Sequence, residues 1–438
     1  MFSDRNFLKI LPLLLSLVIC SLFLHLFSAP GISMAEKKSN EPASVLIPQD
    51  EDTYQNTNKP LPGPVSGDED KDTSLNTDRN LPVPLPDNEE DTYPDQDQTP
   101  EKPKLPDEIP RPLGYYEYQF DKTFGGYGLG NGYFRLPVDI GIDRDDNIYI
   151  CDMEAGKIQK FDSEGNFDRE WESLLLENDE AFKQSDTMDE PRALYVDYKE
   201  RIGQTVIYVT DTKNNRILQF NKYGRLIDPE GEEIEDTQAW LKMVKTEENS
   251  PCKLWGDFGS KECEFHHPVD IAVDEYDNCY ILDSKNSRIQ CFDYKGEFKF
   301  EWGGFGSGPG SFIRPTRLAY DPSRFRAIWV IDSKNSKFIK FDLNGDFVKA
   351  YIPKDKNGQP LPGPSDLCFD TQGFIYVTDS TLNKVFKYNN DVEYIQCWGE
   401  TGREQGQFKN PQAIAIDSED RVLVVDTGNF RIQIFRRF

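Results

Sequence analysis

The sequence is poor in the residues on which most metal and acid–base sites depend. It has three histidines in 438 residues, and one of them, His25, lies in an apolar N-terminal run. The other two, His266 and His267, are adjacent, and neighbouring side chains on an extended segment point to opposite sides. This excludes a zinc or acid–base site built on several histidines. The eight cysteines include no Cys-x-x-Cys pair, which excludes zinc-ribbon and thioredoxin-like sites.

Positive charge is scarce as well. The chain has 50 lysines and arginines against 77 aspartates and glutamates, which gives a formal net charge of −27. Residues 1–35 carry +1, residues 36–112 carry −11 and residues 113–438 carry −17. An acidic surface favours solubility and argues against nucleic acids and anionic membrane surfaces as partners.

Residues 1–35 have the features of an export signal. An apolar run spans Phe7–Phe27, and Arg5 and Lys9 lie near its start. The small residues Ser33 and Ala35 then follow at the spacing of a peptidase site. We predict a secretory signal peptide. The alternative is an uncleaved membrane anchor, because a spanning helix needs only about 17 apolar residues or more.

In both cases we expect the rest of the chain to be exported to the cell envelope, the periplasm or the extracellular space. It would be either free or tethered through residues 7–27. Residues 36–112 are crowded with proline, acidic residues, asparagine and threonine. Such a segment has too little apolar surface to offset its ordering entropy, so we predict a disordered, extended stalk. Residues 113–438 form the predicted folded domain.

A pattern repeated six times organises this domain. Each copy opens on a proline before an apolar run: Pro137, Pro191, Pro268, Pro315, Pro364 and Pro411. A second β-type run ends in an aspartate: Asp152, Asp211, Asp283, Asp332, Asp379 and Asp426. A basic residue follows five positions later: Lys157, Arg216, Arg288, Lys337, Lys384 and Arg431. Each copy predicts a four-stranded meander, which needs other copies to bury its faces.

Four of the connections between copies share an aromatic residue, glycine-rich turns and a phenylalanine three residues before the next proline. The sequence from Trp302, WGGFGSGPGSFIRP, is typical of them. Together with the motifs PVDIAVD and DSKNSRIQ around Asp283, these features resemble NHL repeats from about Tyr115 to Phe438. The Gly-His and Trp-Asp markers of WD40 repeats are missing. No kinase or RING pattern precedes the repeats.

The resemblance implies an all-β, six-bladed β-propeller, in agreement with six opening prolines. The last copy ends after three strands, and residues 115–124 supply a further strand-like run. We therefore predict that this N-terminal strand completes the C-terminal blade and closes the ring, which leaves no open sheet edge. We expect a monomer. Cys252 and Cys263 are the predicted disulfide pair, and a short helix is predicted after Asp236.

Loops on a rigid ring carry binding, so the face with the turns after strands two and four is the expected site. The candidate binding residues on it are Arg135, Arg192, His266, His267, Arg314 and Arg317. The six aligned aspartates occur in every copy, and we interpret them as structural, since a carboxylate at a strand end accepts turn N–H groups.

Two residues after the opening proline the copies differ, and Asp139, Asp270 and Asp366 stand there on alternate blades. They could hold Ca²⁺ through hard oxygen ligands, or they could be hydrogen-bonded to inner-strand backbone and water. Some propellers that resemble this chain are lyases or lactonases, and the lyases use histidines that this chain lacks. We predict a binding or scaffold module for a protein, peptide or glycan, with no cofactor. The alternative is a calcium-dependent hydrolase or lyase at the channel mouth.

Overall fold

The computed structural model describes residues 114–172, 187–234 and 256–438. All of them belong to the second of two compact units, which spans residues 99–438. The predicted signal peptide, the predicted stalk, Cys252 and the predicted helix after Asp236 lie outside the described residues. Among the residues described, no helix is long and apolar enough to cross a membrane.

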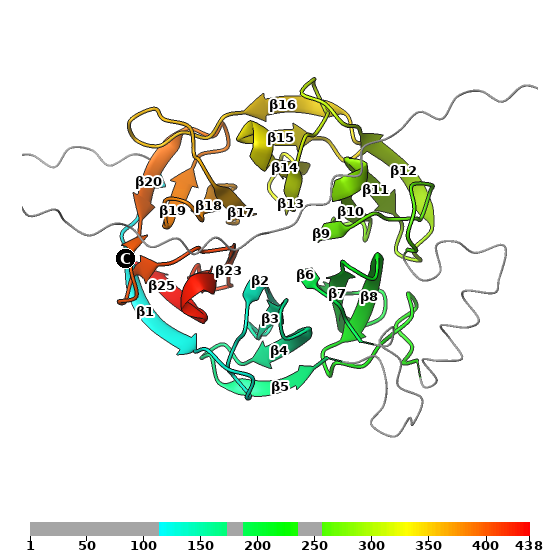
Figure 1. Cartoon of the computed structure of the whole chain (residues 1–438), viewed down its shortest axis with the longest axis horizontal. Helices are drawn as coiled ribbons and strands as arrows, with labels where there is room; N and C mark the ends of the chain where they lie inside the picture. The colour runs from blue at the N-terminus through cyan, green and yellow to red at the C-terminus, as the bar shows by residue number, and fades with distance from the viewer. Residues whose placement is uncertain (1–113, 173–186, 235–255) are drawn as a thin grey trace, which may run out of the picture. The chain divides into compact units, whose positions relative to one another are not determined.

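The described strands form six sheets arranged as blades around a central axis (Figure 1). Blade 1 consists of β2 (Pro137–Ile142), β3 (Ile148–Asp152), β4 (Lys157–Phe161) and β5 (Phe167–Trp171). The described strands of blade 2 are β6 (Pro191–Lys199), β7 (Gln204–Asp211) and β8 (Arg216–Asn221). Blade 3 consists of β9 (Pro268–Val273), β10 (Cys279–Asp283), β11 (Arg288–Phe292) and β12 (Phe298–Gly303). Blade 4 consists of β13 (Pro315–Asp321), β14 (Ala327–Asp332), β15 (Lys337–Phe341) and β16 (Phe347–Tyr351).

Blade 5 consists of β17 (Pro364–Phe369), β18 (Ile375–Asp379), β19 (Lys384–Tyr388) and β20 (Tyr394–Trp398). Blade 6 contains β23 (Ala413–Ile416), β24 (Val422–Asp426), β25 (Arg431–Arg437) and the N-terminal strand β1 (Tyr118–Gly125). The link between them holds the short parallel pair β21 (Glu400–Thr401) and β22 (Gln407–Phe408). Single-turn 3₁₀ helices follow the second strand of blades 3, 4 and 6: η2 (Ser284–Asn286), η3 (Ser333–Asn335) and η4 (Thr427–Asn429).

The predicted closure of the ring is confirmed. Strand β1 pairs antiparallel with β25, with Phe120 opposite Phe435. The innermost strands of blades 6 and 1 are also in contact, and the hydroxyl of Thr427 donates to the carbonyl of Pro137 at 2.7 Å. Each innermost strand therefore has a neighbour on both sides, and the chain ends meet in one sheet.

The repeat pattern explains why each blade forms. Most innermost strands begin at a proline, which has no N–H to leave unpaired at a strand start. The second strands are largely apolar up to their final aspartate, and every residue of β3 and β10 is buried. Aromatic rings join the blades: the ring of Trp302 in blade 3 lies 5.8 Å from that of Phe341 in blade 4. Gly345 lies against this tryptophan, where an added Cβ would come within 2.7 Å of the ring.

The described cysteines fall into two groups. Cys263 is disulfide-bonded, and the five other described cysteines are free. Cys252, the partner predicted for Cys263, lies outside the described residues. Cys151, Cys279 and Cys291 are buried inside blades, where they act as small apolar side chains.

Candidate functional site

A cavity of about 800 Å³ opens at one mouth of the central channel. Three repeat positions line it. The residue after the opening proline does so in all six blades: Val138, Arg192, Val269, Thr316, Ser365 and Gln412. The residue before this proline does so in five: Leu136, His267, Arg314, Gly363 and Asn410. The residue after the second-strand aspartate also does so in five: Met153, Ser284, Ser333, Ser380 and Thr427. The cavity thus lies on the predicted face.

The charged side chains that line this cavity are all cationic. They are Arg192, Lys285, Arg314 and Arg317, and no carboxylate is among the described residues of the lining. The folded domain as a whole is strongly acidic. A cavity with one sign of charge focuses the field on its contents, so this mouth attracts anions even though the rest of the surface repels them.

Arg192 is only weakly compensated. Its Nε is buried and has no hydrogen-bond partner among the described residues, and its Nη2 lies 4.0 Å from Glu190. Burial lowers the pKa of Arg192, and the nearby charges of Arg317 and Arg314 lower it further. His267 is affected in the same way: burial, together with Arg192 and Lys285, lowers its pKa to about 4. Repulsion among these groups would be relieved by an anionic ligand.

Arg317 forms the floor of the cavity. It extends from β13 in blade 4, and its Nη2 donates to the carbonyl of Val138 in the opposite blade 1 at 2.8 Å. Its Nε donates to the carbonyl of Ser365 in blade 5 at 3.3 Å. The guanidinium also lies 3.7 Å from a carboxylate oxygen of Asp139 and 3.8 Å from one of Asp366. One side chain therefore bridges three blades across the channel.

The three predicted metal ligands surround this arginine, and each joins its blade to the next. Asp139 accepts from the backbone N–H of Leu194 at 2.7 Å, Asp270 from that of Leu318 at 2.6 Å, and Asp366 from that of Ile414 at 3.0 Å. Burial raises the pKa of all three carboxyl groups, and that of Asp366 to about 7, while the charge of Arg317 opposes the rise.

This arrangement does not fit calcium. A calcium ion needs about six to eight oxygen ligands, and here each carboxylate has an oxygen committed to a backbone N–H. The guanidinium of Arg317 already supplies the positive charge between Asp139 and Asp366. Among the described residues, no group of three or more acidic, histidine or cysteine side chains has the geometry to hold a metal ion. The geometry agrees with the other prediction, that the aspartates bind inner-strand backbone.

Below this network lies a second chamber of about 280 Å³. Its walls include apolar residues of the innermost strands, such as Ile140, Leu318 and Ile414, together with the three carboxylates. Arg317 lines the upper cavity and the carboxylates line the lower chamber, so this network lies between the two.

Comparisons with known proteins agree with this geometry. A family described as "6-bladed beta-propeller" matches residues 259–355, and the NHL repeat matches residues 408–435. The described domain is an NHL-repeat β-propeller. The chain is similar to protein brain tumor of Drosophila melanogaster, with 23% identity over 185 residues, which are 42% of this chain and 13% of that protein. It is also similar to NHL repeat-containing protein 3 of Homo sapiens, with 33% identity over 82 residues, or 18% of this chain and 24% of that protein.

The chain therefore spans less than a quarter of the length of these two relatives. Among solved structures, a protein of unknown function from Bacteroides thetaiotaomicron is similar with a TM-score of 0.51 and 13% identity, over 74% of this chain and 77% of that one. A likeness at this identity concerns the fold of the NHL propeller alone.

The six aligned aspartates of the NHL propeller are structural, as predicted. Each accepts backbone N–H bonds from the connection before its blade; Asp152, for example, accepts from Arg135 and Leu136 at 2.8 Å. Where the base five residues later is an arginine, its Nε donates to the aspartate, at 2.7 Å for Arg216 and for Arg431. Lys157 instead donates to Glu170 at 2.6 Å. These side chains fix backbone and leave little capacity for a ligand.

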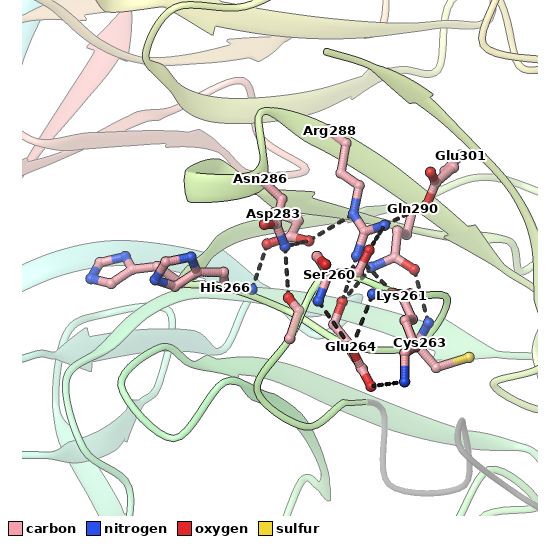
Figure 2. Close-up of polar contacts among 12 residues, drawn as sticks. Ser260, Lys261, Cys263, Glu264, His266, Asp283, Asn286, Arg288, Gln290 and Glu301 are labelled. Atoms are coloured by element: carbon pink, nitrogen blue, oxygen red, sulfur yellow. Dashed lines mark hydrogen bonds and ion pairs between the residues drawn. The ribbon is translucent and has the colours of Figure 1, made fainter. Parts of the chain in front are cut away.

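Figure 2 shows this role in blade 3, where Arg288 is saturated by its own blade. Its Nε donates to Asp283 at 2.9 Å, and its two terminal nitrogens donate to Glu301 and to the carbonyls of Ser260, Lys261 and Glu264 at 2.7–2.8 Å. Gln290 accepts from the N–H of Cys263 at 3.0 Å on the same connection. The approach to blade 3 is therefore held rigidly beside the cavity.

Two of the six candidate binding residues lie outside the central cavity. The guanidinium of Arg135 is paired with Glu154 on the exposed surface, and the ring of His266 packs edge-on against Phe258, 5.1 Å between centroids. The other four, Arg192, His267, Arg314 and Arg317, all line the cavity.

Sequence reasoning missed the uncharged members of the lining. Ser365 and Gln412 stand at the same repeat position as Arg192, and Met153 stands beside an aligned aspartate. The signal was available: these positions differ from copy to copy although they lie next to a proline or aspartate that every copy shares.

A second depression of about 590 Å³ adjoins blade 1 on the same face and shares Leu136 and Met153 with the central cavity. Its charged lining is acidic, with Glu154, Glu172, Asp189 and Glu190. Glu172 and Thr187 in this lining flank residues 173–186, which lie outside the described residues.

Proposed function

We propose that this NHL propeller is an exported binding module that takes a protein, peptide or glycan ligand at the central cavity. The observation that carries the proposal is the charge of the lining: four cations and no carboxylate among its described residues, in an acidic domain. A structural cation in a propeller is normally paired, as Arg288 is. A buried Arg192 Nε without a partner among the described residues is instead suited to a ligand.

The proposed location of the protein rests on residues 1–35, whose composition is typical of an export signal. The binding site does not depend on whether this segment is cleaved. The calcium-dependent alternative has no observation in its favour, because Arg317 lies where the metal would have to bind.

A capture experiment with the full chain as bait tests this proposal. The wild type is compared with an Arg192→Gln, Arg314→Gln double variant in an extract of exported material. The matched control is Arg144→Gln: Arg144 is exposed and pairs with Glu200 at 2.7 Å, in the β2–β3 turn at the far end of blade 1. We expect a ligand that the wild type and the control capture and the double variant loses. Equal capture by all three proteins would refute the cavity as the site.

The salt dependence provides a second measurement. Exposed charge pairs are largely screened at about 1 M salt, where the Debye length falls to about 3 Å. Capture by the wild type should therefore weaken as salt rises, whereas a ligand held by apolar contacts alone would be retained.

A further inference from the structure

The lining of the cavity is divided by chemistry as well as by blade. Its cations come from blades 2, 3 and 4, through Arg192, Lys285, Arg314 and Arg317. Blades 5 and 6 contribute uncharged polar side chains, such as Ser365, Ser380 and Gln412. Blade 1 contributes Leu136, Val138 and Met153, which are all apolar. Blades 3 and 4 and the link between them also contribute apolar residues, Val269, Phe305, Ile313 and Pro315, so what sets blade 1 apart is that it contributes no charged or polar side chain.

The polar sector of blades 5 and 6 offers acceptors. Ser365 donates its hydroxyl hydrogen to the carbonyl of Pro411 at 2.7 Å, and Thr427 donates to that of Pro137 at 2.7 Å. Gln412 uses its amide N–H on Asn410 at 2.9 Å. Thr427 is buried, but the lone pairs of the Ser365 hydroxyl and of the Gln412 amide oxygen remain for a ligand, so this sector is suited to N–H donors.

The apolar sector separates two classes of ligand. An acidic sugar carries a carboxylate and hydroxyl groups, and both suit the cationic and polar sectors, but it has no bulky apolar group for Met153, Leu136 and Val138. A peptide carries all three: an acidic side chain, backbone N–H donors and an aliphatic side chain. Covering apolar surface is favourable in proportion to its area, so the third contact adds affinity.

We propose that the cavity recognises an acidic segment of a peptide or protein with an aliphatic residue close to the acidic one. The carboxylate binds on the side of Arg192 and Arg314, the backbone N–H groups bind on the side of Ser365 and Gln412, and the aliphatic side chain contacts Met153. This rests on the proposed function, because it assigns a ligand class to the same cavity.

Defined probes test the assignment. End-blocked hexapeptides of glycine carry one Glu and one Leu, separated by zero, one or two residues, and are titrated into the full chain by calorimetry. The tightest of them is then compared with its Glu→Gln and Leu→Ser forms and with trigalacturonate. The protein variants are Arg314→Gln, Met153→Ser and Val138→Thr, the last of which keeps the shape of the side chain. Arg144→Gln is the control, and thermal unfolding verifies that each variant folds.

We expect the Glu→Gln peptide to bind about tenfold more weakly than the Glu peptide, because it cannot form a charge-assisted hydrogen bond with an arginine of the cavity. The Leu→Ser peptide should lose about threefold or more, and Met153→Ser or Val138→Thr should abolish that difference. Arg314→Gln should weaken every acidic probe. If the Leu and Ser peptides bind equally, or if only trigalacturonate binds, the peptide assignment fails while the cavity remains an anion site. If no carboxylate probe responds to Arg314→Gln, the proposed function fails as well.

Discussion

Replacement of Arg317 by methionine should destabilise the propeller in a way that depends on pH. Methionine keeps much of the apolar volume of the side chain but removes the charge between Asp139 and Asp366 and the two hydrogen bonds to carbonyls of blades 1 and 5. Breaking a buried ion pair by removing one partner costs about 3–5 kcal/mol, because the other charge is left uncompensated. A domain of ordinary stability has about 5–15 kcal/mol in total, so the loss is large.

The sign of the pH dependence follows from the carboxyl groups. In the wild type the pKa of Asp366 is already raised to about 7 by burial, against the opposing charge of Arg317. Without Arg317 the folded-state pKa values of Asp139 and Asp366 rise further above those of the unfolded chain. The folded state then binds more protons than the unfolded state, and stability falls as pH rises above about 4. The destabilisation by Arg317→Met should therefore be smaller at pH 5 than at pH 8.

Urea unfolding of the full chain, followed by tryptophan fluorescence at both pH values, measures this effect. Arg144→Met, on an exposed side chain, is the control and should change the free energy of unfolding by no more than about 0.5 kcal/mol. Adding Asp139→Asn and Asp366→Asn to Arg317→Met should recover part of the loss, since an amide oxygen can still accept from the next blade. An equal loss at pH 5 and pH 8, without recovery in the triple variant, would show that packing and not charge is responsible.

Three further results are expected. Deletion of residues 113–124 removes most of β1 and should abolish cooperative unfolding, because β25 becomes an open edge; an unchanged melting curve would contradict the closure. His267, whose pKa is lowered to about 4, should be neutral from pH 6 to pH 8, so its titration should not change anion affinity across this range; an NMR titration midpoint near 6.5 would refute this. Gly345→Ala should cost more stability in urea than Gly358→Ala, because both glycines have positive φ but only Gly345 faces a ring, that of Trp302; equal costs would show that the conformation alone decides.

The fold could be predicted because each blade depends on signals that are local in the sequence. An opening proline, an apolar strand and an aspartate that caps the following turn specify one meander, and six copies specify the ring. The closure by β1 was predictable for the same reason, since the last copy lacked a strand and the first residues of the domain supplied one. Neither step required knowledge of which side chains meet across the channel.

The site could be predicted only in part, because its geometry depends on such meetings. Asp139, Asp270, Arg317 and Asp366 occupy one register position, so the sequence shows three carboxylates and one guanidinium at the same height. Whether the carboxylates gather around a metal ion or around the arginine depends on the length of that arginine relative to the channel. The structure shows that Arg317 reaches the carbonyl of Val138 on the opposite blade.

The repeat therefore separates two kinds of position that lie next to each other along the chain. Asp426 accepts from the N–H of Lys409 at 2.7 Å and from Arg431, which fixes the connection to its blade. Pro411 opens this blade as a proline opens every copy, whereas the next residue, Gln412, lines the cavity and differs from its counterparts in the other blades. Residues of the first kind are the same in every blade because each blade needs the same turn. Residues of the second kind differ between blades, as the proposed binding of one ligand by the whole ring would require. Function in this propeller is therefore to be sought where the copies differ.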